Sequence, residues 1–542
     1  MEKFIKKTSS FIFSQQKSIF SSALLLSLMI VVSRFFGFIR YRTLAGFFTT
    51  EQLDIFFASF RIPDLVFEIL ITGALTSTFI PIFIKYQRNK EELSENISSI
   101  INFIFFSMVI FIIILSFLLD FIIPVITPGY SYAKNSQIII FSRLLLLGQL
   151  PFLVMGNFLT GIGQADKTFL LTAVAPIIYN LAIVLATIFF ASTFMLMAPI
   201  VGVIIGAVLF FTIQLPLLFN SQFSYQFILK KTSGLIEFIR MMIPRAFTVI
   251  VAQIDATIDL TLTTFLGAGS YTVFYLAQHL QLFPVSVIGI AFGQASLPYL
   301  SEMFQEKRME EFKKIIIDSI LNVFFLTIPI MSFFVFSRTP LIRLFFGGQK
   351  FDWEATVQTA VTLSYFSLSL PFHAIYYFLT RCFYALLDSR TPFYISVLSI
   401  AINTFFSLVF IFIFHLPVWA LAISFSLSMV INVILLFSIL AVRLKNLDYR
   451  FLIVESLKIV SVTAIISVIT YYAMKLMDGL VFDTTRTINV FFLLVVAGII
   501  YLFLYLSLSF IFNIKEIYLI TKLIIKAKEY QKRFMEIYTN YE

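Results

Sequence analysis

Residues 33–81 read SRFFGFIRYRTLAGFFTTEQLDIFFASFRIPDLVFEILITGALTSTFIP, and this stretch decides the fold class because charges stand inside long apolar runs. Eight of its residues are charged, four of them arginine. A charge at membrane depth costs about 3 kcal/mol on insertion scales, so it is seldom kept without a role. Arginine cannot lose its proton to avoid this cost, so the cluster predicts a site for an anionic substrate. The predicted substrate-binding residues are Arg34, Arg40, Arg42, Asp54, Arg61, Asp64 and Glu68.

The same charges also have a structural interpretation. Arg61, Asp64 and Glu68 follow at three- and four-residue spacing, so they share one side of a helix and can pair there. The matching region of the second half offers only Gln278 and His279. If the charges served only to hold helices together, both halves of the chain would be expected to carry them. The asymmetry between the halves therefore favours a ligand site.

The composition is that of a membrane protein. The chain has 542 residues, 60% of them hydrophobic and 13% charged, with a mean hydropathy of +0.97, whereas soluble domains carry about 25% charged residues. The single cysteine, Cys382, excludes an intramolecular disulfide. The sequence has no HExxH, GxSxG, P-loop or dinucleotide-binding pattern, so we expect a transporter and not an enzyme. We expect no cofactor and no nucleic-acid partner.

Apolar runs of about 20 residues predict an all-α polytopic protein with about fourteen transmembrane helices. Lys and Arg are far more frequent in the loops on the side of the N-terminus, which predicts that both termini are cytoplasmic. The basic N-terminus lacks a small-x-small cleavage site and is interpreted as a cytoplasmic tail. The lysine-rich C-terminal tail predicts an interfacial amphipathic helix, the alternative being a solvated tail. The predicted spans are 20–47, 54–84, 97–124, 137–163, 168–191, 195–217, 243–266, 271–300, 314–337, 356–385, 392–414, 418–441, 452–474 and 487–512.

The chain contains an internal repeat. Residues 150–160 read LPFLVMGNFLT and residues 370–380 read LPFHAIYYFLT, and each run leads through a short turn into a span with an asparagine, Asn180 or Asn403. Transporters are often built from repeats that rock against each other around a substrate path. We predict two pseudo-symmetric six-helix lobes, 1–220 and 221–445, followed by two extra helices in 446–513 and a cytoplasmic tail in 514–542. Prolines inside the spans indicate kinks, and their similar positions in the two lobes favour a gating role.

Other polar residues lie within predicted spans. Asp255 and Asp259 are one helical turn apart on one face, where a carboxylate pair can bind a cation or a proton. The first interpretation of Asn403 is that its side chain forms a hydrogen bond between two helices. Lys458 and Glu455 are predicted to pair near the membrane interface.

The run SRFFGFIRYRTLAGFF...DIFFASFRIPDL...GALTSTFIPIF resembles the opening of the MurJ (MviN) lipid II flippases, within the multidrug/oligosaccharidyl-lipid/polysaccharide exporter superfamily. The runs AQHLQLFPVSVIGIAFGQASLPYLS at 277–301 and LPF...RCFYALLDSRTP at 370–392 are further similarities. The resemblance covers most of the chain. It implies a flippase that moves the lipid-linked peptidoglycan precursor across the cytoplasmic membrane of a bacterium.

The resemblance also implies residue roles. Arg34, Arg40 and Asp54 match positions that line the family's cationic cavity, which receives the diphosphate and sugar head group. Asp259 and Asn403 match positions of a sodium site in some members. The last two spans match helices that form a groove for the lipid tail.

Several positions depart from the family pattern. Tyr41 stands where an acid is common, Phe67 and His279 where arginines are expected, and Ser407 at a polar sodium-site position. Part of the cationic lining is therefore missing or moved, to Arg42 and Arg61 as one interpretation. These departures concern the identity of the head group more than the transport class.

The sequence thus predicts a monomeric lipid II flippase that works by alternating access, driven by membrane potential or by Na⁺. Its predicted partners are a lipid-linked anionic substrate and membrane lipids. Three alternatives remain open: a flippase for another polyprenyl-diphosphate-linked glycan, a cation-coupled drug exporter, and a non-transporting scaffold that kept the fold.

Overall fold

A computed structural model describes residues 19–71 and 78–518, and all regular elements in these ranges are helical. Residues 1–18 of the predicted N-terminal tail and residues 519–542 of the predicted C-terminal tail (514–542) lie outside the described residues. By contact density the chain divides into two compact units. Unit 1 is Met1–Thr272 with Phe345–Ala355, and unit 2 is Val273–Leu344 with Thr356–Glu542. The lobes are defined by the repeat and not by contact density, so their predicted boundaries stay a prediction.

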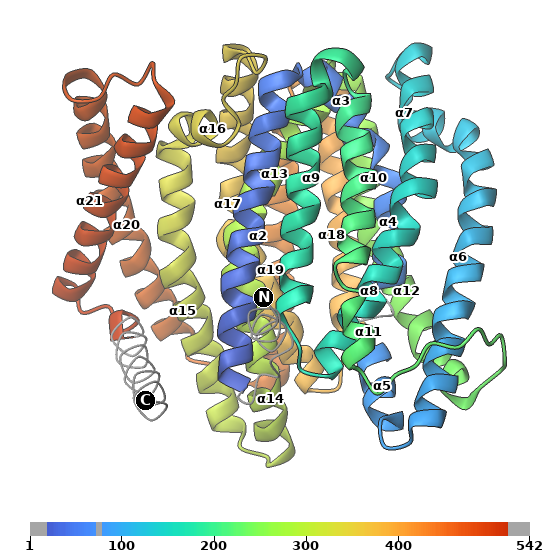
Figure 1. The fold of residues 1–542 in the computed structure, drawn as a ribbon. Coiled ribbons are helices and arrows are strands. Elements are labelled where there is room, and N and C mark those ends of the chain that lie inside the picture. Colours follow the sequence, from blue (N-terminus) through green and yellow to red (C-terminus); the bar gives the residue numbers. More distant parts are fainter. Residues whose placement is uncertain (1–18, 72–77, 519–542) are drawn as a thin grey trace, which may run out of the picture. The chain divides into compact units, whose positions relative to one another are not determined.

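Unit 1 contains a bundle of long apolar helices broken by short ones (Figure 1). α9 packs against α10 and α2, α3 packs against α7, and α4 packs against α12 and α8. In chain order the helices are α2 (Ile19–Phe47), α3 (Thr50–Ser59), α4 (Arg61–Leu70), α5 (Ile80–Tyr86), α6 (Lys90–Ile126), α7 (Tyr132–Leu144), the π-helix η2 (Leu145–Gln149), α8 (Leu150–Ala165), α9 (Leu170–Phe194), α10 (Met197–Thr212), α11 (Pro216–Asn220), α12 (Ser233–Thr263) and the 3₁₀ turn η3 (Thr264–Leu266).

Most of the remaining helices belong to unit 2. Two tyrosines of its last helix donate hydrogen bonds to backbone carbonyls of α15: Tyr501 to Pro329 at 3.1 Å and Tyr505 to Phe325 at 2.8 Å. The helices are α13 (Ser270–Pro284), the π-helix η4 (Val285–Ile290), α14 (Ala291–Gln305), α15 (Met309–Phe336), α16 (Arg338–Phe346), α17 (Trp353–Ala385), α18 (Arg390–Leu408), the π-helix η5 (Val409–Ile413), α19 (Trp419–Leu444), α20 (Tyr449–Leu480) and α21 (Thr487–Ile511).

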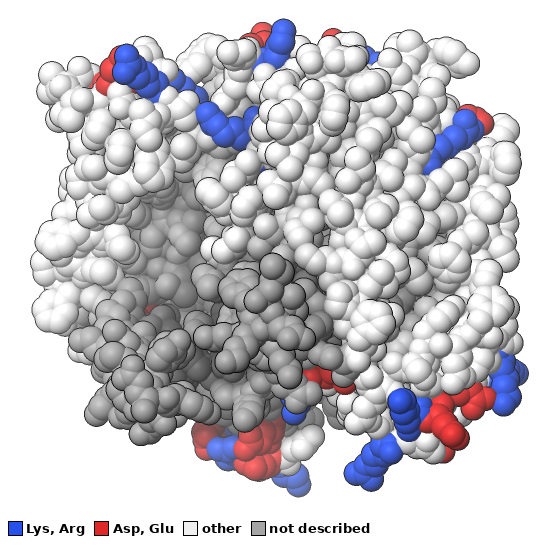
Figure 2. Space-filling model, viewed as in Figure 1, with Lys and Arg blue, Asp and Glu red and all other residues white. Residues whose placement is uncertain are grey.

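Within the described residues, eleven helices are long and apolar enough to cross a membrane. Helices suit this solvent because they satisfy their own backbone groups. The other three predicted spans correspond to α2, to α3–α5 and to α17, so the polytopic all-α fold is as predicted and the count of fourteen stays a prediction. On the face shown in Figure 2, most of the described charged side chains gather near the helix ends, and most of the described surface between them is uncharged.

The backbone repeats with an offset of 220 residues. α9 begins at Leu170 and α18 at Arg390, after helices that end at Ala165 and Ala385. The turns between these helices each hold one residue with positive φ, Lys167 at 60° and Leu387 at 59°. A second pair follows at the far ends of α9 and of α18 with η5, where Met195 has φ 48° and His415 has φ 50°. Because positive φ is uncommon outside glycine, two such coincidences support the predicted repeat.

Candidate functional site

The helix break before Pro63 shapes the region that carries the predicted charges. A capping box starts α3, with the Thr49 and Gln52 side chains each accepting a hydrogen bond from the other residue's backbone N–H, at 3.4 and 3.1 Å. Pro63 has no N–H, so the carbonyl of Ser59, four residues earlier, has no helical donor. The hydroxyl of Ser142 on α7 donates to this carbonyl at 2.9 Å. The predicted kink is therefore a break between α3 and α4, with its freed carbonyl satisfied from a neighbouring helix.

Asp54 is fully buried and its carboxylate is occupied by hydrogen bonds. Oδ2 accepts from the backbone N–H of Gly269 at 2.7 Å, and Oδ1 accepts from the backbone N–H and hydroxyl of Thr272, both at 2.8 Å. Gly269 has φ +85°, and a Cβ there would lie 2.5 Å from Oγ1 of Thr50. Asp54 therefore fixes the tight loop that starts α13. Its predicted contact with substrate stays a prediction.

Arg61 is held by α12. Its Nη2 donates to the backbone oxygen and to Oε1 of Gln253, both at 2.6 Å, and its Nε donates to the hydroxyl of Thr257 at 3.0 Å. The side chain is 9% exposed. This fork of donors on one neighbouring helix ties α4 to α12 and gives Arg61 a positioning role.

A charged cluster surrounds Asp64 at the start of α4. Asp64 interacts electrostatically with Arg61, Glu68 and Arg40, so the predicted structural pairing and the predicted site share these residues. The guanidinium of Arg40 lies 4.6 Å from the ring centre of Tyr41. The structure thus brings Arg40, Arg61, Asp64 and Glu68 together inside unit 1.

Two tyrosines that the sequence analysis did not predict also interact with this cluster. Tyr179 on α9 interacts with Arg40 and Asp64, and its hydroxyl accepts from Nε2 of Gln149 at 3.1 Å. Tyr271 interacts with Arg61, Asp64 and Asp259. The signal for Tyr179 was its place beside the repeated asparagine, and Tyr271 opens a predicted span.

The remaining predicted residues are more dispersed. On α2, Arg34 is exposed and Arg42 is half-buried. On α12, Asp259 is 3% exposed and Asp255 is half-buried, one turn away. Asn403 is buried on α18 in unit 2, whereas both aspartates belong to unit 1. A shared ion site stays a prediction.

The positions that depart from the family pattern are packed. Tyr41 is 8% exposed and packs tilted against Phe57 and edge-on against Phe346, with ring centres 6.0 and 6.4 Å away. His279 lies against Tyr275 of its own helix, with Nδ1 2.9 Å from the Tyr275 carbonyl oxygen. Aromatic packing occupies both positions.

A family model described as "Lipid II flippase MurJ" matches residues 44–492, which include most of the charged stretch and both copies of the repeat. The chain belongs to the MurJ lipid II flippase family. It is a multi-pass transporter of the bacterial inner membrane and not an enzyme, as predicted. Lipid-linked substrates and membrane lipids are the partners that this membership implies.

Individual MurJ relatives agree with the family match. The chain is 26% identical over 498 residues to a probable lipid II flippase MurJ of Buchnera aphidicola subsp. Acyrthosiphon pisum, covering 88% of this chain and 95% of that one. It is 25% identical over 434 residues to the lipid II flippase MurJ of Burkholderia cenocepacia, covering 78% and 83%.

Solved structures show the same fold. A lipid II flippase MurJ in an inward closed conformation superposes with a TM-score of 0.73 at 23% identity, covering 90% of this chain and 98% of that one. An inward-facing multidrug resistance MATE transporter gives a TM-score of 0.65 at 14% identity, covering 79% and 99%. The MurJ-type architecture therefore extends to the wider exporter superfamily named from the sequence.

Proposed function

We propose that this MurJ-family chain translocates lipid II across the cytoplasmic membrane by alternating access. The observation that carries the proposal is the cluster of Arg40, Arg61, Asp64 and Glu68 within a bundle of apolar helices. Fixed cations in a low-dielectric bundle attract a diphosphate strongly, and arginine can bind it through two parallel hydrogen bonds.

We assign different roles to the arginines. Arg34 and Arg40 lie on α2, with Arg34 exposed, and we assign the contact with the diphosphate to these two. Arg61 is already engaged by Gln253 and Thr257, so it holds α4 in place instead of contacting the cargo. Asp54 positions the loop before α13 in the same way. Asp64 and Glu68 offset the charges of Arg40 and Arg61, so the cluster is formally neutral and the substrate can leave as well as bind.

The driving force is membrane potential or a sodium ion, because the sequence has no nucleotide-binding motif. Asp259 supports ion coupling, since it is buried beside Tyr271 and through it adjoins the charged cluster. An ion there would change the charge that the arginines experience. We further propose a monomer with both termini in the cytoplasm, in line with the lysine and arginine bias of the loops.

A flippase for another polyprenyl-diphosphate-linked glycan is the second candidate. It is favoured by Tyr41, whose buried ring replaces a charge in the family pattern beside Arg40. The diphosphate would be gripped in the same way, and the sugar would differ.

The test is complementation of flippase-depleted bacterial cells, with lipid II translocation as the readout. Arg40→Ala and Arg34→Ala should each reduce translocation by about tenfold or more, because one charge-assisted contact contributes about 1.5–3 kcal/mol. Arg450→Ala, an exposed arginine at the start of α20, is the matched control and should leave translocation unchanged. Unchanged translocation in both test variants would contradict the proposal.

The cargo is identified separately. Mass spectrometry of lipids that co-purify with the wild-type chain should find lipid II, and Arg40→Ala should lose it. A different diphosphate-linked glycan in the same preparation would establish the second candidate instead.

A further inference from the structure

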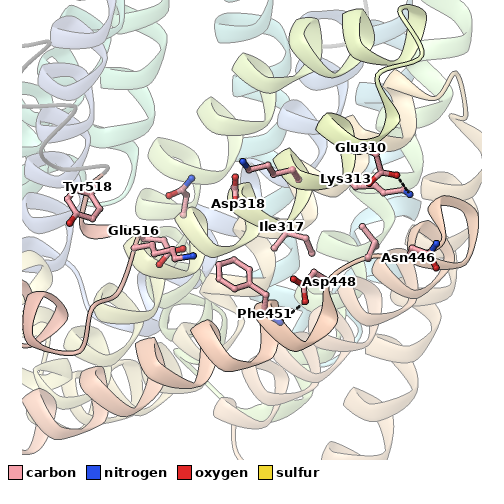
Figure 3. A pocket seen from close by; sticks show the side chains of 13 residues that line it. Glu310, Lys313, Ile317, Asp318, Asn446, Asp448, Phe451, Glu516 and Tyr518 are labelled. Atoms are coloured by element: carbon pink, nitrogen blue, oxygen red, sulfur yellow. Dashed lines mark hydrogen bonds and ion pairs between the residues drawn. The ribbon is translucent and has the colours of Figure 1, made fainter.

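Unit 2 contains a pocket of about 650 Å³ with many charged side chains in its lining (Figure 3). It is bounded by the first turns of α15 and α20 and by the segment that follows α21. These are the ends of three candidate membrane spans, and the predicted topology places them on the same side, where we expect lipid head groups. Its volume is within the range of small-molecule sites, about 300–1,000 Å³.

The pocket holds a buried carboxylate that lacks a full set of partners. Glu516 lines it and is 7% exposed, and its Oε2 has no hydrogen-bond partner among the described residues. Figure 3 shows Glu516 on one side of the pocket, with Phe451 of α20 and Asp318 of α15 around the same space. Burial raises the pKa of Glu516, the carboxylates of Glu455 and Asp318 add to the rise, and the charge of Lys515 opposes it. A buried acceptor of this kind favours a ligand that brings a cationic N–H donor.

The nearby carboxylate of Glu455 cannot donate a hydrogen bond to Glu516. Glu455 is 5% exposed, and its Oε1 pairs with Lys458 at 2.8 Å, as the sequence predicted. Its Oε2 also has no hydrogen-bond partner among the described residues. A metal ion is a poor candidate here, because no group of three or more His, Cys, Asp or Glu side chains in the described ranges is arranged to hold one.

Lysines line the same pocket. Lys515 lies with its Nζ 4.5 Å from the ring centre of Phe451, Lys314 is exposed, and Lys313 pairs with Glu310 at 2.8 Å at the rim. Lys314 and Lys515 therefore offer positive charge to an anionic group a short distance from Glu516. The lining suits a ligand with a phosphate at one end and an ammonium at the other.

We propose that this pocket binds the head group of an aminophospholipid such as phosphatidylethanolamine, with its phosphate toward Lys314 and Lys515 and its ammonium on Glu516. A membrane supplies such lipids at this depth, and Ile317, Leu447 and Phe451 provide apolar wall for the glycerol region. The site goes beyond lipid II translocation, and its binding is measured without any transport.

The test uses the full-length chain in detergent and native mass spectrometry with dioctanoyl lipids. Phosphatidylethanolamine should bind about tenfold more tightly than phosphatidylcholine, whose quaternary ammonium has no N–H to donate. Glu516→Gln should abolish this preference. Glu91→Gln, which removes an exposed carboxylate at the start of α6 and outside the pocket, is the matched control and should keep it.

Three results would overturn the proposal. Equal binding of phosphatidylcholine would remove the role of the ammonium, and equal or tighter binding of phosphatidylglycerol would mark a purely anionic site. Free phosphoethanolamine that binds as tightly as the lipid would exclude a lipid as the source. If Glu516→Gln does not fold, the comparison of lipids on the wild-type chain decides alone.

Discussion

The two copies of the repeat use the same backbone with different chemistry. α3 begins at Thr50 and α13 at Ser270, 220 residues later. In the first copy Asp54 is buried and takes three hydrogen bonds, whereas its counterpart Phe274 packs its ring 5.1 Å from that of Phe366. Arg61 binds α12, whereas its counterpart Gln281 donates to Ser369 at 3.1 Å. The same backbone can therefore be built at these positions without charges, whereas in the first copy the charges of Asp54 and Arg61 hold neighbouring segments in place.

The largest expected effect is on Asp54. Asp54→Ala leaves the buried N–H groups of Gly269 and Thr272 without an acceptor, at a cost of about 3 kcal/mol or more. The melting temperature in detergent should fall sharply. Phe274→Leu, a conservative change at the counterpart, should have a smaller effect. If the two variants melt alike, the first copy does not depend on its carboxylate.

A second prediction replaces Arg61 with the residue of the other copy. Arg61→Gln removes the fork of donors to Gln253 and Thr257 and should cost about 2 kcal/mol, together with reduced translocation. Arg61→Lys should restore little, because an ammonium cannot reproduce the fork. Rescue of both stability and translocation by Lys would show that only the charge matters.

A smaller effect concerns the turn between α17 and α18. Asp388 pairs with Arg443 at 2.6 Å, and its hydrogen bonds with Thr391 and the nearby Arg443 lower its pKa to about 2. Because the folded-state pKa lies below the unfolded value of about 3.9, the stabilisation is present above pH 4 and is lost as the pH falls towards 2. Asp388→Thr, which installs the residue of the first copy at Thr168, should cost about 1 kcal/mol at pH 7. Melting curves at pH 7 and pH 3 should differ less for the variant than for wild type.

The smallest effect is expected at the surface. Lys85 pairs with Glu237 at 2.6 Å, and both side chains are exposed. The counterpart 220 residues later is Gln305. Lys85→Gln should leave the melting temperature and translocation unchanged, because exposed pairs are screened by water and salt. A clear loss of stability would give this ion pair a larger role than its exposure suggests.

The sequence predicted the helices well because apolar run length is a local signal. Each predicted span coincides with helical residues in the described ranges, and the break at Pro63 follows from its missing N–H. The partners of the charged residues were not predictable in this way. Asp54 meets Thr272 and Arg61 meets Gln253 across 218 and 192 residues of chain, and nothing in the local pattern encodes these pairings.

The candidate site was predicted as a set of charges and not as a division of roles. The sequence placed Asp54 and Arg61 with the substrate-binding residues, since charge at membrane depth looks the same whatever it contacts. Tyr179 and Tyr271 were missed because their places, beside a repeated asparagine and at the start of a predicted span, say nothing about contact with the charged cluster. Residue roles depend on which oxygen or nitrogen is already engaged, which only the packed helices determine.

The hydrogen bond from Ser142 to the carbonyl of Ser59 gives the junction of α3 and α4 a mechanical property. Bending a continuous helix in lipid exposes a backbone carbonyl, and no water is present there to donate a hydrogen bond to it. Here the carbonyl of Ser59, which Pro63 leaves without a helical donor, already accepts a hydrogen bond from the Ser142 side chain on α7. The junction is therefore a joint that can flex without opening a helical hydrogen bond at that point, and it lies directly before the charged turn of α4.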